Sequence, residues 1–535
     1  MFALDAHWLD KGSASSWREP LALLLLCVAP LVWLSAGIFD TLLFDVDEGA
    51  FSEATREMIA SGDWWHTTLQ GQDRFDKPMG VYWLQALAVK TWGLHEWVLR
   101  LPSVLACWIT ALALGHFAWK RWGTAAGLMA GLIHSTSLGP WAMAHAATAD
   151  SVLGLWLVLT ALDLGRFLLD GAQVHHIRRT VLWVGLGVLT KGPIALLIPV
   201  ATFVIWSLLQ RSSRHLWLAL RDIPSWLILL ALCVPWYGYA LWRHGEYFVQ
   251  GFWVQHNVHR FGAAMEGHGG AWYYYLAVAP LLWMPWSPLL LTIGRKVNAL
   301  WSEKVSLYAL VWSGFVLIFF SLSRTKLPHY ILYAAPGVTL LLVQASRQAS
   351  VRAWVVCTMF LMAWLAGLTG FPGLLQRFAH LIPDTRYQTL LQTANAIHEP
   401  LAFAMGGVGL MLACWCAFAY RLRFVVIGYA MASVVCCLVL GVTVLPWWGQ
   451  TLQGPVRALA LLSRERPEVV VQWGGNWPSF AVYRQHIAPQ RMPEPGEMAL
   501  VRSNWHAVPA HWPVIAQERG MALVQRPVND LREKN

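Results

Sequence analysis

The most constraining feature of this sequence is a series of apolar runs, each about long enough to cross a lipid bilayer as a helix. A spanning helix needs about 20 mostly apolar residues. Such runs lie near residues 21–39, 98–119, 123–143, 150–169, 180–190, 193–210, 225–242, 272–292, 305–322, 328–345, 353–371, 400–419 and 424–446. Hydrophobic residues make up 57% of the 535-residue chain and charged residues only 13%, about half of what a soluble domain carries. The sequence therefore predicts a mostly α polytopic membrane protein with about 13 transmembrane helices.

The positions of Lys and Arg predict the orientation of these helices. If the N-terminus is cytoplasmic, basic residues fall in alternate connections between the runs, as the positive-inside rule requires. These connections contain Lys11, Arg18, Lys120, Arg121, Arg166, Arg178, Arg179, Arg211, Arg214, Arg221, Arg295, Lys296, Lys304, Arg347, Arg352, Arg421 and Arg423. The alternation depends on a break at residues 191–193, where Gly and Pro either separate two spans or kink one. The net charge of +10 is explained by loops facing anionic lipid, so we expect membrane lipids and no nucleic acid as partners.

The composition changes after Pro446, which predicts a second domain. Residues 447–535 contain more Pro, Gly and charge, with strand-like pieces at 469–473, 479–484, 498–502 and 521–525. We therefore expect a transmembrane domain at 1–446 and a small α/β domain at 447–535. An odd number of spans places this C-terminal domain in the periplasm. The run at 21–39 is too long for a signal peptide and is predicted to be an uncleaved first span.

The first outer loop, about residues 40–97, is acidic and contains a predicted surface helix. Apolar residues such as Phe51 and Met58 share one stripe of this helix, and charged residues such as Glu53 share another. Asp47 and Glu48 stand at its start. Asp47 either caps the helix, with both acids favoured by the helix dipole, or serves as a general base at the lipid boundary.

Cations recur on the predicted outer side, where the positive-inside rule does not expect them. Lys77 follows Asp76 in the first loop, and it either snorkels or holds a lipid phosphate. Segments 253–261 and 323–330 also carry cations, as does the break at 191–193. Several outer cations opposite one acidic loop indicate an anionic ligand and a base. No nucleotide-binding motif of diagnostic quality is visible, so an already activated polyprenyl phosphosugar fits as substrate.

Together these motifs resemble the bacterial branch of the protein O-mannosyltransferase superfamily, in particular the family that transfers 4-amino-4-deoxyarabinose to lipid A. The matching segments occur in family order between residues 45 and 335, and they are 47–48, 56–58, 61–64, 75–78, 82–83, 100–103, 148–150, 191–192, 256–257, 260–261 and 326–330. The resemblance implies an inverting glycosyltransferase of the membrane C-type (GT-C) fold in the bacterial inner membrane. It would take a sugar from a polyprenyl (undecaprenyl) phosphate donor to a lipid or glycan acceptor on the periplasmic side.

The resemblance also implies roles for individual residues. Asp47 matches the catalytic aspartate of the family, with Glu48 beside it and Asp150 as a second acidic position. The predicted phosphate-binding residues are Lys77, Arg260, Lys326, Tyr330, Lys191 and Tyr82. His256 and Asp76 fall where the family can place a metal, although the family usually has Glu at the latter position. Because Lys and Arg can stabilise a departing phosphate, we expect no cofactor to be required, with a divalent metal as the alternative.

Two other functions stay open at this point. One is a lipid A aminoarabinose transferase in the strict sense. The other is a flippase or transporter of lipid-linked sugars. A transporter would bury ionisable residues near the bilayer midplane and show internal repeats. Here the charges cluster at the predicted outer surface and no repeat is visible, which favours a transferase.

Overall fold

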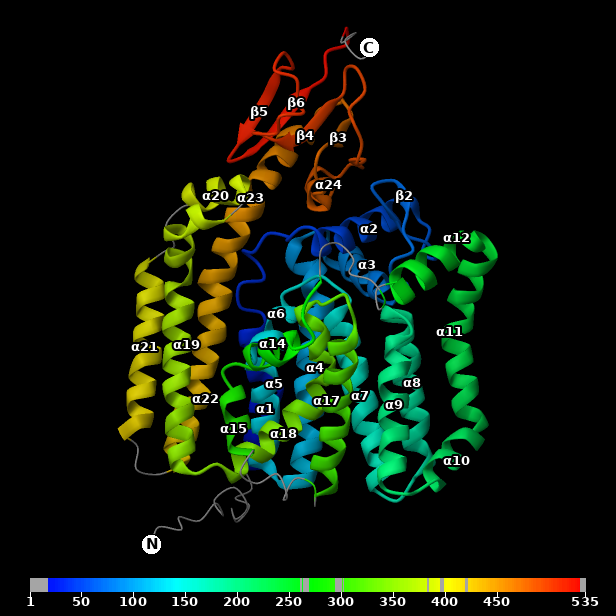
Figure 1. The fold of residues 1–535 in the computed structure, drawn as a ribbon, viewed down its shortest axis with the longest axis vertical. Coiled ribbons are helices and arrows are strands. Elements are labelled where there is room, and N and C mark those ends of the chain that lie inside the picture. The colour runs from blue at the N-terminus through cyan, green and yellow to red at the C-terminus, as the bar shows by residue number, and fades with distance from the viewer. Residues whose placement is uncertain are drawn as a thin grey trace.

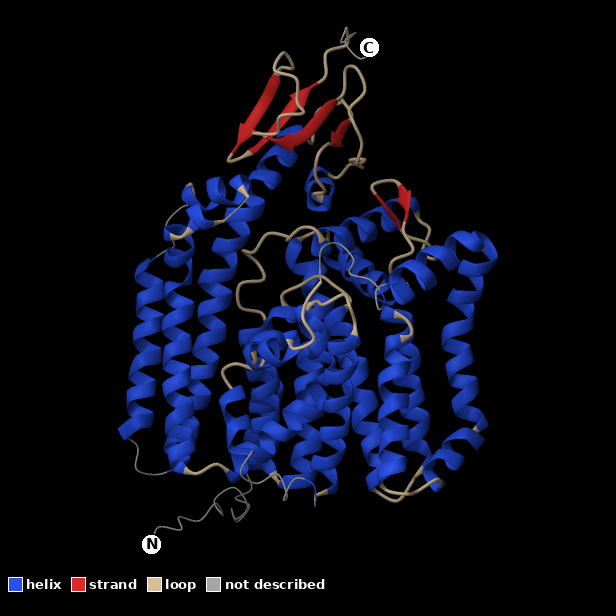
Figure 2. Cartoon of the chain, in the orientation of Figure 1, coloured by secondary structure: helices blue, strands red, loops and turns tan. Residues whose placement is uncertain are grey.

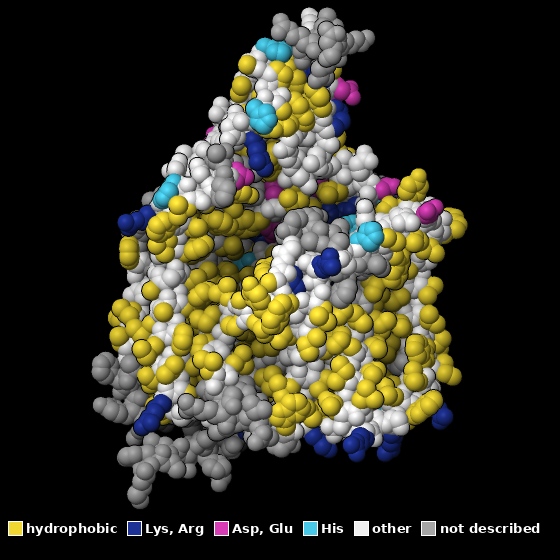
Figure 3. All heavy atoms as spheres, in the orientation of Figure 1, with side chains coloured by type: hydrophobic (Ala, Val, Ile, Leu, Met, Phe, Trp, Pro, Cys, Tyr) yellow, Lys and Arg dark blue, Asp and Glu magenta, His cyan; other side chains and the backbone are white. Residues whose placement is uncertain are grey.

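A computed structural model gives the architecture of the chain and describes residues 18–259, 262, 269–293, 301, 303–382, 384–394, 399–418 and 422–529. Long helices run side by side through one body, and a small sheet stands at one end of it (Figures 1 and 2). Apolar side chains cover the middle of the visible face, and several Lys and Arg side chains lie along the edge farthest from the sheet (Figure 3). This distribution is the one expected of a protein whose surroundings are lipid.

The predicted apolar runs fold as helices. The main ones are α1 (Arg18–Leu34), α4 (Glu96–Trp122), α5 (Thr124–Thr136), α6 (Leu138–Ala144), α7 (Asp150–Leu169), α8 (Val174–Lys191), α9 (Ile194–Leu209), α11 (Ile223–His244), α17 (Lys304–Leu322), α18 (Ala335–Gln348), α19 (Val351–Arg377), α21 (Glu399–Phe418) and α22 (Leu422–Val439). Among the described residues, 6 helices are long and apolar enough to cross a membrane, and α1, α9 and part of α21 are shorter apolar helices. A multi-pass membrane protein is thus supported, and the count of thirteen spans stays a prediction.

Two of the predicted apolar stretches are broken in the structure. At residues 191–193 the chain breaks into separate helices, because Gly192 adopts a φ of +91° that ends α8. The run 272–292 is interrupted, forming α14 (Tyr274–Leu282), the short helix η3 (Ser287–Leu289) and α15 (Leu290–Ile293). Prolines at 285 and 288 explain this interruption, since each lacks the N–H that a continuous helix needs.

A surface layer lies across the end of the helix bundle that faces the sheet (Figure 1). It consists of α2 (Asp47–Ser61), the hairpin β1 (Thr68–Leu69) and β2 (Gln72–Asp73), and α3 (Gly80–Trp92). The charged stripe expected to face water is largely covered, with Glu53 and Glu57 both buried. Glu57 accepts hydrogen bonds from the hairpin, including the N–H of Gln70 at 2.7 Å. The hairpin therefore covers part of the polar face of α2 and forms hydrogen bonds with it.

The C-terminal region begins as a continuation of the membrane helices. The π-helical turn η7 (Leu440–Val444) joins α22 to α23 (Leu445–Ser463), so helical structure continues through the predicted boundary at 447. Pro446 is the second residue of α23 and follows the π-helical turn directly, so its missing N–H falls at the junction of the two helical segments.

Beyond α23 the chain forms a four-stranded sheet with one short helix. The strands are β3 (Val470–Gln472), β4 (Met498–Arg502), β5 (Val514–Glu518) and β6 (Met521–Gln525), in the order β3-β4-β6-β5. The pair β3–β4 is parallel and the other pairs are antiparallel. Three predicted strands are confirmed. The strand predicted at 479–484 is wrong, because this segment is the helix α24 (Pro478–Arg484), started by a proline whose φ suits the first helical turn.

Candidate active site

A cavity that holds charged groups opens between the surface layer and the helix bundle. Its volume is about 310 Å³, at the small end of ligand-binding pockets. We call it the main cavity. Its polar lining includes Asp76, Lys77, Lys191, His256 and Tyr330, and its apolar lining includes Ile194, Leu197, Trp253, Phe319 and Phe320. One cavity thus offers cations to an anion and apolar surface to a hydrocarbon chain.

Asp76 organises the first group of charges in the main cavity. Its carboxylate is paired with Lys77, with Arg74 at 3.0 Å and with Nδ1 of His256 at 3.0 Å. Burial opposes ionisation of Asp76, but Lys77, His256 and Arg74 together hold its pKa well below the usual range. The segment before α3 therefore carries a carboxylate that stays charged and keeps the buried Lys77 ammonium in place.

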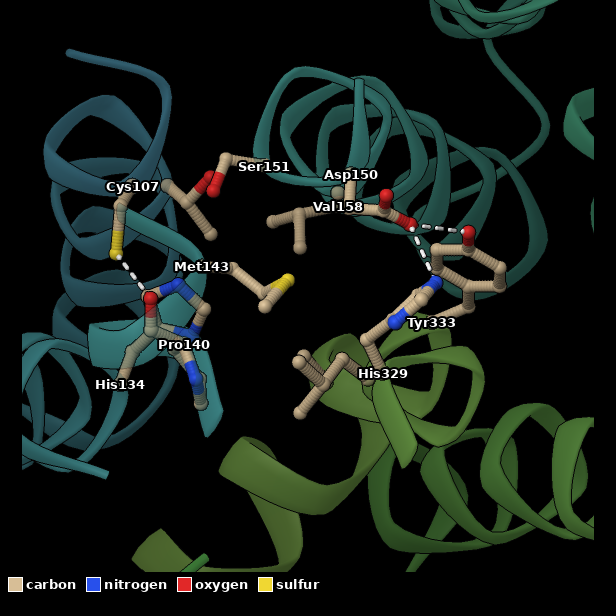
Figure 4. Close-up of a pocket in the computed structure, with 13 residues that line it drawn as sticks. Cys107, His134, Pro140, Met143, Asp150, Ser151, Val158, His329 and Tyr333 are labelled. Atoms are coloured by element: carbon tan, nitrogen blue, oxygen red, sulfur yellow. Dashed lines mark hydrogen bonds and ion pairs between the residues drawn. The ribbon is translucent and has the colours of Figure 1, made fainter. Parts of the chain in front are cut away.

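Asp150 organises the second group. At the first residue of α7, it accepts a hydrogen bond from Lys191 Nζ at 2.5 Å and from the Tyr333 hydroxyl at 2.8 Å. His329 Nε2 lies 3.5 Å from the same oxygen (Figure 4). The Lys191 ammonium also lies over the rings of Tyr330 and Tyr333, 5.5 and 5.7 Å from their centroids, which favours the cation. Lys191 reaches this position because α8 ends at Gly192.

The close approach of the Phe252 ring to the backbone at Gly192 brings the groups of Asp76 and Asp150 to one place. A Cβ atom at Gly192 would lie 2.8 Å from the ring of Phe252, too close for any residue other than glycine. Phe252 belongs to the π-helix η2 (Val249–His259), which also carries His256. The glycine therefore lets η2 pack directly on the α8–α9 break, beside Lys191.

A second, smaller cavity lies behind Asp150. It measures about 40 Å³ and is lined by Cys107, His134, Met143 and His329 among others (Figure 4). Tyr333 lines both cavities. This volume suffices for a water molecule or two. Tyr333 thus lies between the small cavity and the main cavity, and Asp150 lines the small one.

Asp47 lies next to the Asp76 group rather than in the lining of the main cavity. It is the first residue of α2, its side chain is exposed, and it is close enough to Arg74 for an electrostatic attraction. The N-cap position belongs to Val46, with no side-chain capping bond. The interpretation of Asp47 as the cap is therefore wrong, and its carboxylate is open to the solvent side of the site.

Glu48 is placed very differently from Asp47. It is 3% exposed and forms a double ion pair with Arg100, at 2.7 and 2.8 Å. It also accepts hydrogen bonds from the N–H groups of Phe44 at 2.8 Å and Ala147 at 2.9 Å. All of its acceptor directions are therefore occupied. This geometry gives Glu48 a part in fixing the start of α2, and it does not support the predicted catalytic role.

Lys326 and Tyr82 are near the site but outside the cavity lining. Lys326 Nζ donates to the carbonyl groups of Phe320, Ser321 and Ser323 at 3.3, 2.9 and 2.6 Å, and so caps the C-terminal end of α17. Burial lowers the pKa of Lys326. Tyr82 is fully buried, stacks on Phe51 with ring centroids 5.6 Å apart, and has a pKa raised by burial to about 12. The direct phosphate contacts predicted for Lys326 and Tyr82 are not supported by this placement. Arg260 lies outside the described residues.

Sequence reasoning missed Tyr333 and passed over Arg74. Tyr333 follows Tyr330 by three residues in the 3₁₀-helix η5 (Pro328–Ala334). Side chains three apart in such a helix are eclipsed, so both tyrosines face the same way. A 3₁₀ reading of this segment, which begins with proline, would have revealed the second tyrosine.

The residues suggested for a divalent metal do not fit one well. His256 and Asp76 are adjacent, but within the described part of the chain no group of three His, Cys, Asp or Glu side chains is arranged to hold a metal. The cations Lys77 and Arg74 already bind the Asp76 carboxylate. A divalent ion would have to displace them or tolerate their repulsion.

Comparison with known proteins supports the resemblance. The family model described as dolichyl-phosphate-mannose-protein mannosyltransferase matches residues 76–239. The chain is 30% identical over 369 residues to the undecaprenyl phosphate-alpha-4-amino-4-deoxy-L-arabinose arabinosyl transferase of Aeromonas salmonicida, covering 66% of this chain and 64% of that protein. It is 28% identical over 312 residues to the transferase of the same name from Erwinia tasmaniensis, covering 56% and 55%. The chain thus matches less than two thirds of the length of these relatives.

The fold extends the similarity over almost the whole chain. The crystal structure of ArnT from Cupriavidus metallidurans bound to undecaprenyl phosphate superposes with a TM-score of 0.79 at 20% identity, covering 96% of this chain and 98% of that one. The resemblance predicted from the motifs is confirmed: the chain is similar in sequence to the arabinosyl transferases, part of it matches the protein mannosyltransferase model, and it has the membrane C-type fold.

Proposed function

We propose that this protein is an inverting glycosyltransferase of the bacterial inner membrane. It moves a sugar from a polyprenyl (undecaprenyl) phosphate to a hydroxyl or phosphate of a lipid or glycan acceptor on the periplasmic side. The observation that carries this proposal is the main cavity, where Lys77 and Lys191 meet apolar side chains in one lining. A phosphate attached to a prenyl chain needs both kinds of surface together.

The cations bind the donor phosphate and stabilise it as it leaves. Lys77 and Lys191 form charge-assisted hydrogen bonds with phosphate oxygens, and the Tyr330 hydroxyl adds a further donor. Asp76 and Asp150 hold the two ammonium groups in position before the donor arrives. Because these groups are fixed in a largely buried site, they stabilise the charge that develops on phosphate without reorganising. Arg260 stays a predicted additional cation.

Asp47 serves as the general base. Its carboxylate accepts the proton of an acceptor hydroxyl while that oxygen forms a bond to the anomeric carbon, and the bond from this carbon to the phosphate oxygen breaks with both electrons leaving on phosphate. Attack on the face opposite the phosphate inverts the anomeric centre. The exposure of Asp47 supports this role, since an acceptor can approach from the solvent side. The residues themselves supply the stabilising positive charge, so we propose a reaction that needs no metal.

The names of the relatives favour a more specific version, in which the sugar is 4-amino-4-deoxy-L-arabinose, and the motif resemblance adds lipid A as the acceptor. The flippase alternative predicts binding of the same donor without chemistry. Both are separated from the general proposal by identifying the product.

The decisive experiment incubates the purified full-length protein in detergent with isotopically labelled undecaprenyl phosphosugars and candidate acceptors. Micelles have no second leaflet, so a labelled glycosylated acceptor can arise only by transfer. We expect transfer with inversion of configuration, detected by mass spectrometry and NMR. The opposite outcome is movement of the donor across the membrane of proteoliposomes, with no product from any donor and acceptor pair in micelles. It would show that the protein is a transporter and not a transferase.

A further inference from the structure

The segment just before Asp47 is held from the membrane side by Arg100. This guanidinium is completely buried and donates to the carbonyl groups of Thr41 at 2.5 Å and Leu42 at 2.8 Å. It also pairs with Glu48 on the other side of Asp47. Arg100 therefore ties together the two ends of the turn that contains Asp47.

The same segment is held from the opposite side by the C-terminal domain. Ser479, at the start of α24, donates to Asp45 through its N–H at 2.8 Å and through its hydroxyl at 2.6 Å. Tyr483, one turn later, accepts a hydrogen bond from the N–H of Leu43 at 2.9 Å. With its amide nitrogen facing the carboxylate, Gln453 of α23 donates to Asp45 at 3.0 Å and accepts from its N–H at 3.1 Å. Two helices of the C-terminal region thus bind the short stretch of chain before Asp47.

The contact between α24 and the start of α2 is tightly packed. A Cβ atom at Gly49, two residues after Asp47, would lie 2.2 Å from Oδ1 of Asp45 and 2.7 Å from the backbone nitrogen of Ser479. Ser479 is 0% exposed. Glycine is therefore required for α24 to seat against the first turn of α2.

We infer that the C-terminal domain is a positioning element of the active site, in which Ser479 and Tyr483 fix the turn 43–49 and thereby aim the carboxylate of Asp47. This rests on the proposed function. Asp47 itself is exposed, so its direction is set by the backbone on which it stands. Displacements of about 1 Å can cost on the order of 100-fold in rate. Among the described residues, those that line the main cavity lie between Asp76 and Tyr333, so we expect donor binding not to depend on this contact.

The test compares Ser479→Ala with wild type in the transfer assay. We expect kcat to fall by on the order of 10–100-fold, with the KM for the donor and equilibrium donor binding unchanged within about twofold. Amide hydrogen exchange in peptides covering residues 41–50 should become faster. A matched control is Glu497→Gln, which breaks an exposed ion pair with Arg491 in the same domain and should change neither quantity.

Tyr483→Phe removes one hydroxyl and keeps the ring. It is a second variant that tests the same inference if Ser479→Ala fails to fold. We expect it to lower kcat in the same direction with donor binding retained. Wild-type kcat and wild-type exchange in both variants would overturn the inference, and so would equal losses of kcat and donor affinity. A wild-type protein that performs no transfer would instead refute the proposed function.

Discussion

The start of α2 and the wall of the main cavity hold their carboxylates in opposite ways. Asp76 in the cavity wall and Asp150 behind it are each bound by a lysine of that wall and by further donors. At the start of α2, Asp47 is exposed and its neighbour Glu48 is locked to Arg100. A carboxylate that already neutralises a cation is a poor base, because protonation breaks the pair. The comparison indicates that the wall binds charge and that Asp47 accepts the proton.

The largest effect should come from removing the proposed base. Asp47→Asn keeps the size of the side chain, and we expect kcat to fall by about 10²–10⁴ while donor binding is retained. Transfer assays and equilibrium binding of labelled donor measure the two quantities. Asp40→Asn, an exposed aspartate in the same connection, is the control and should behave as wild type. Near-normal transfer by Asp47→Asn would remove the distinction between the two regions.

The ion pair between Arg100 and Glu48 at the start of α2 is tested by measuring the stability of the protein. Arg100→Ala leaves Glu48 buried without its cation, and we expect a loss of about 3–5 kcal/mol in the free energy of unfolding. Thermal unfolding in detergent measures it. Asp170→Asn breaks the more exposed pair with Arg121 and should cost less than about 1 kcal/mol. If Arg100→Ala unfolded no more easily than this control, Glu48 would have to be reconsidered as a catalytic group.

The wall is tested by comparing two lysines. Lys77→Ala removes a charged donor from the main cavity, and we expect donor affinity to fall by about 10–100-fold, equivalent to 1.5–3 kcal/mol for a hydrogen bond to a charged group. Lys326→Ala should leave donor affinity unchanged and lower the melting temperature, since its ammonium caps α17. Isothermal titration with undecaprenyl phosphate measures the affinity. Equal losses of affinity in both variants would return Lys326 to the phosphate site.

The smallest effect concerns pH. The pKa of Asp76 is lowered by its cationic partners, below an ordinary value of 3.8. The unfolded chain therefore binds this proton more readily than the folded one, and the stability that the group contributes above pH 3.8 is lost as the pH falls below it. We expect Asp76→Asn to be less stable than wild type at pH 6 and the difference to shrink towards pH 3. Melting curves across this range check the sign, and a constant difference would contradict the assigned pairing.

Much of the fold and of the cavity wall was predictable from the sequence. Apolar runs give helices because length and composition alone decide whether a segment can lie in lipid. The wall residues Lys77, Lys191, His256 and Tyr330 were identified because each is a polar group beside an apolar run. The segments that carry them do come together in one cavity.

The rest depends on contacts that no local pattern contains. Asp47 and Glu48 are adjacent acidic residues that the sequence does not distinguish. Their roles differ because Arg100, which is distant in sequence, forms an ion pair with Glu48. Lys326 resembles a ligand-binding lysine in sequence. In the structure its ammonium donates hydrogen bonds to carbonyl groups at the end of the preceding helix. The edge strand β5 has no clear alternation of buried and exposed residues, so its sequence carries no strand period. α24 is seven residues long, too short for a helical period to be recognised.

The unbroken run of helix from α22 through α23 has a mechanical consequence. Residues Phe424–Ser463 form one continuous rod of 40 residues, and Figure 1 shows it leading directly to the sheet. Each residue added to a helix turns the rest of the chain by about 100° and lifts it by about 1.5 Å. The number of residues in this helix therefore sets which side of α24 meets Asp45. A single residue inserted midway along the helix would rotate Ser479 away from Asp45, although no residue of the contact itself had been changed.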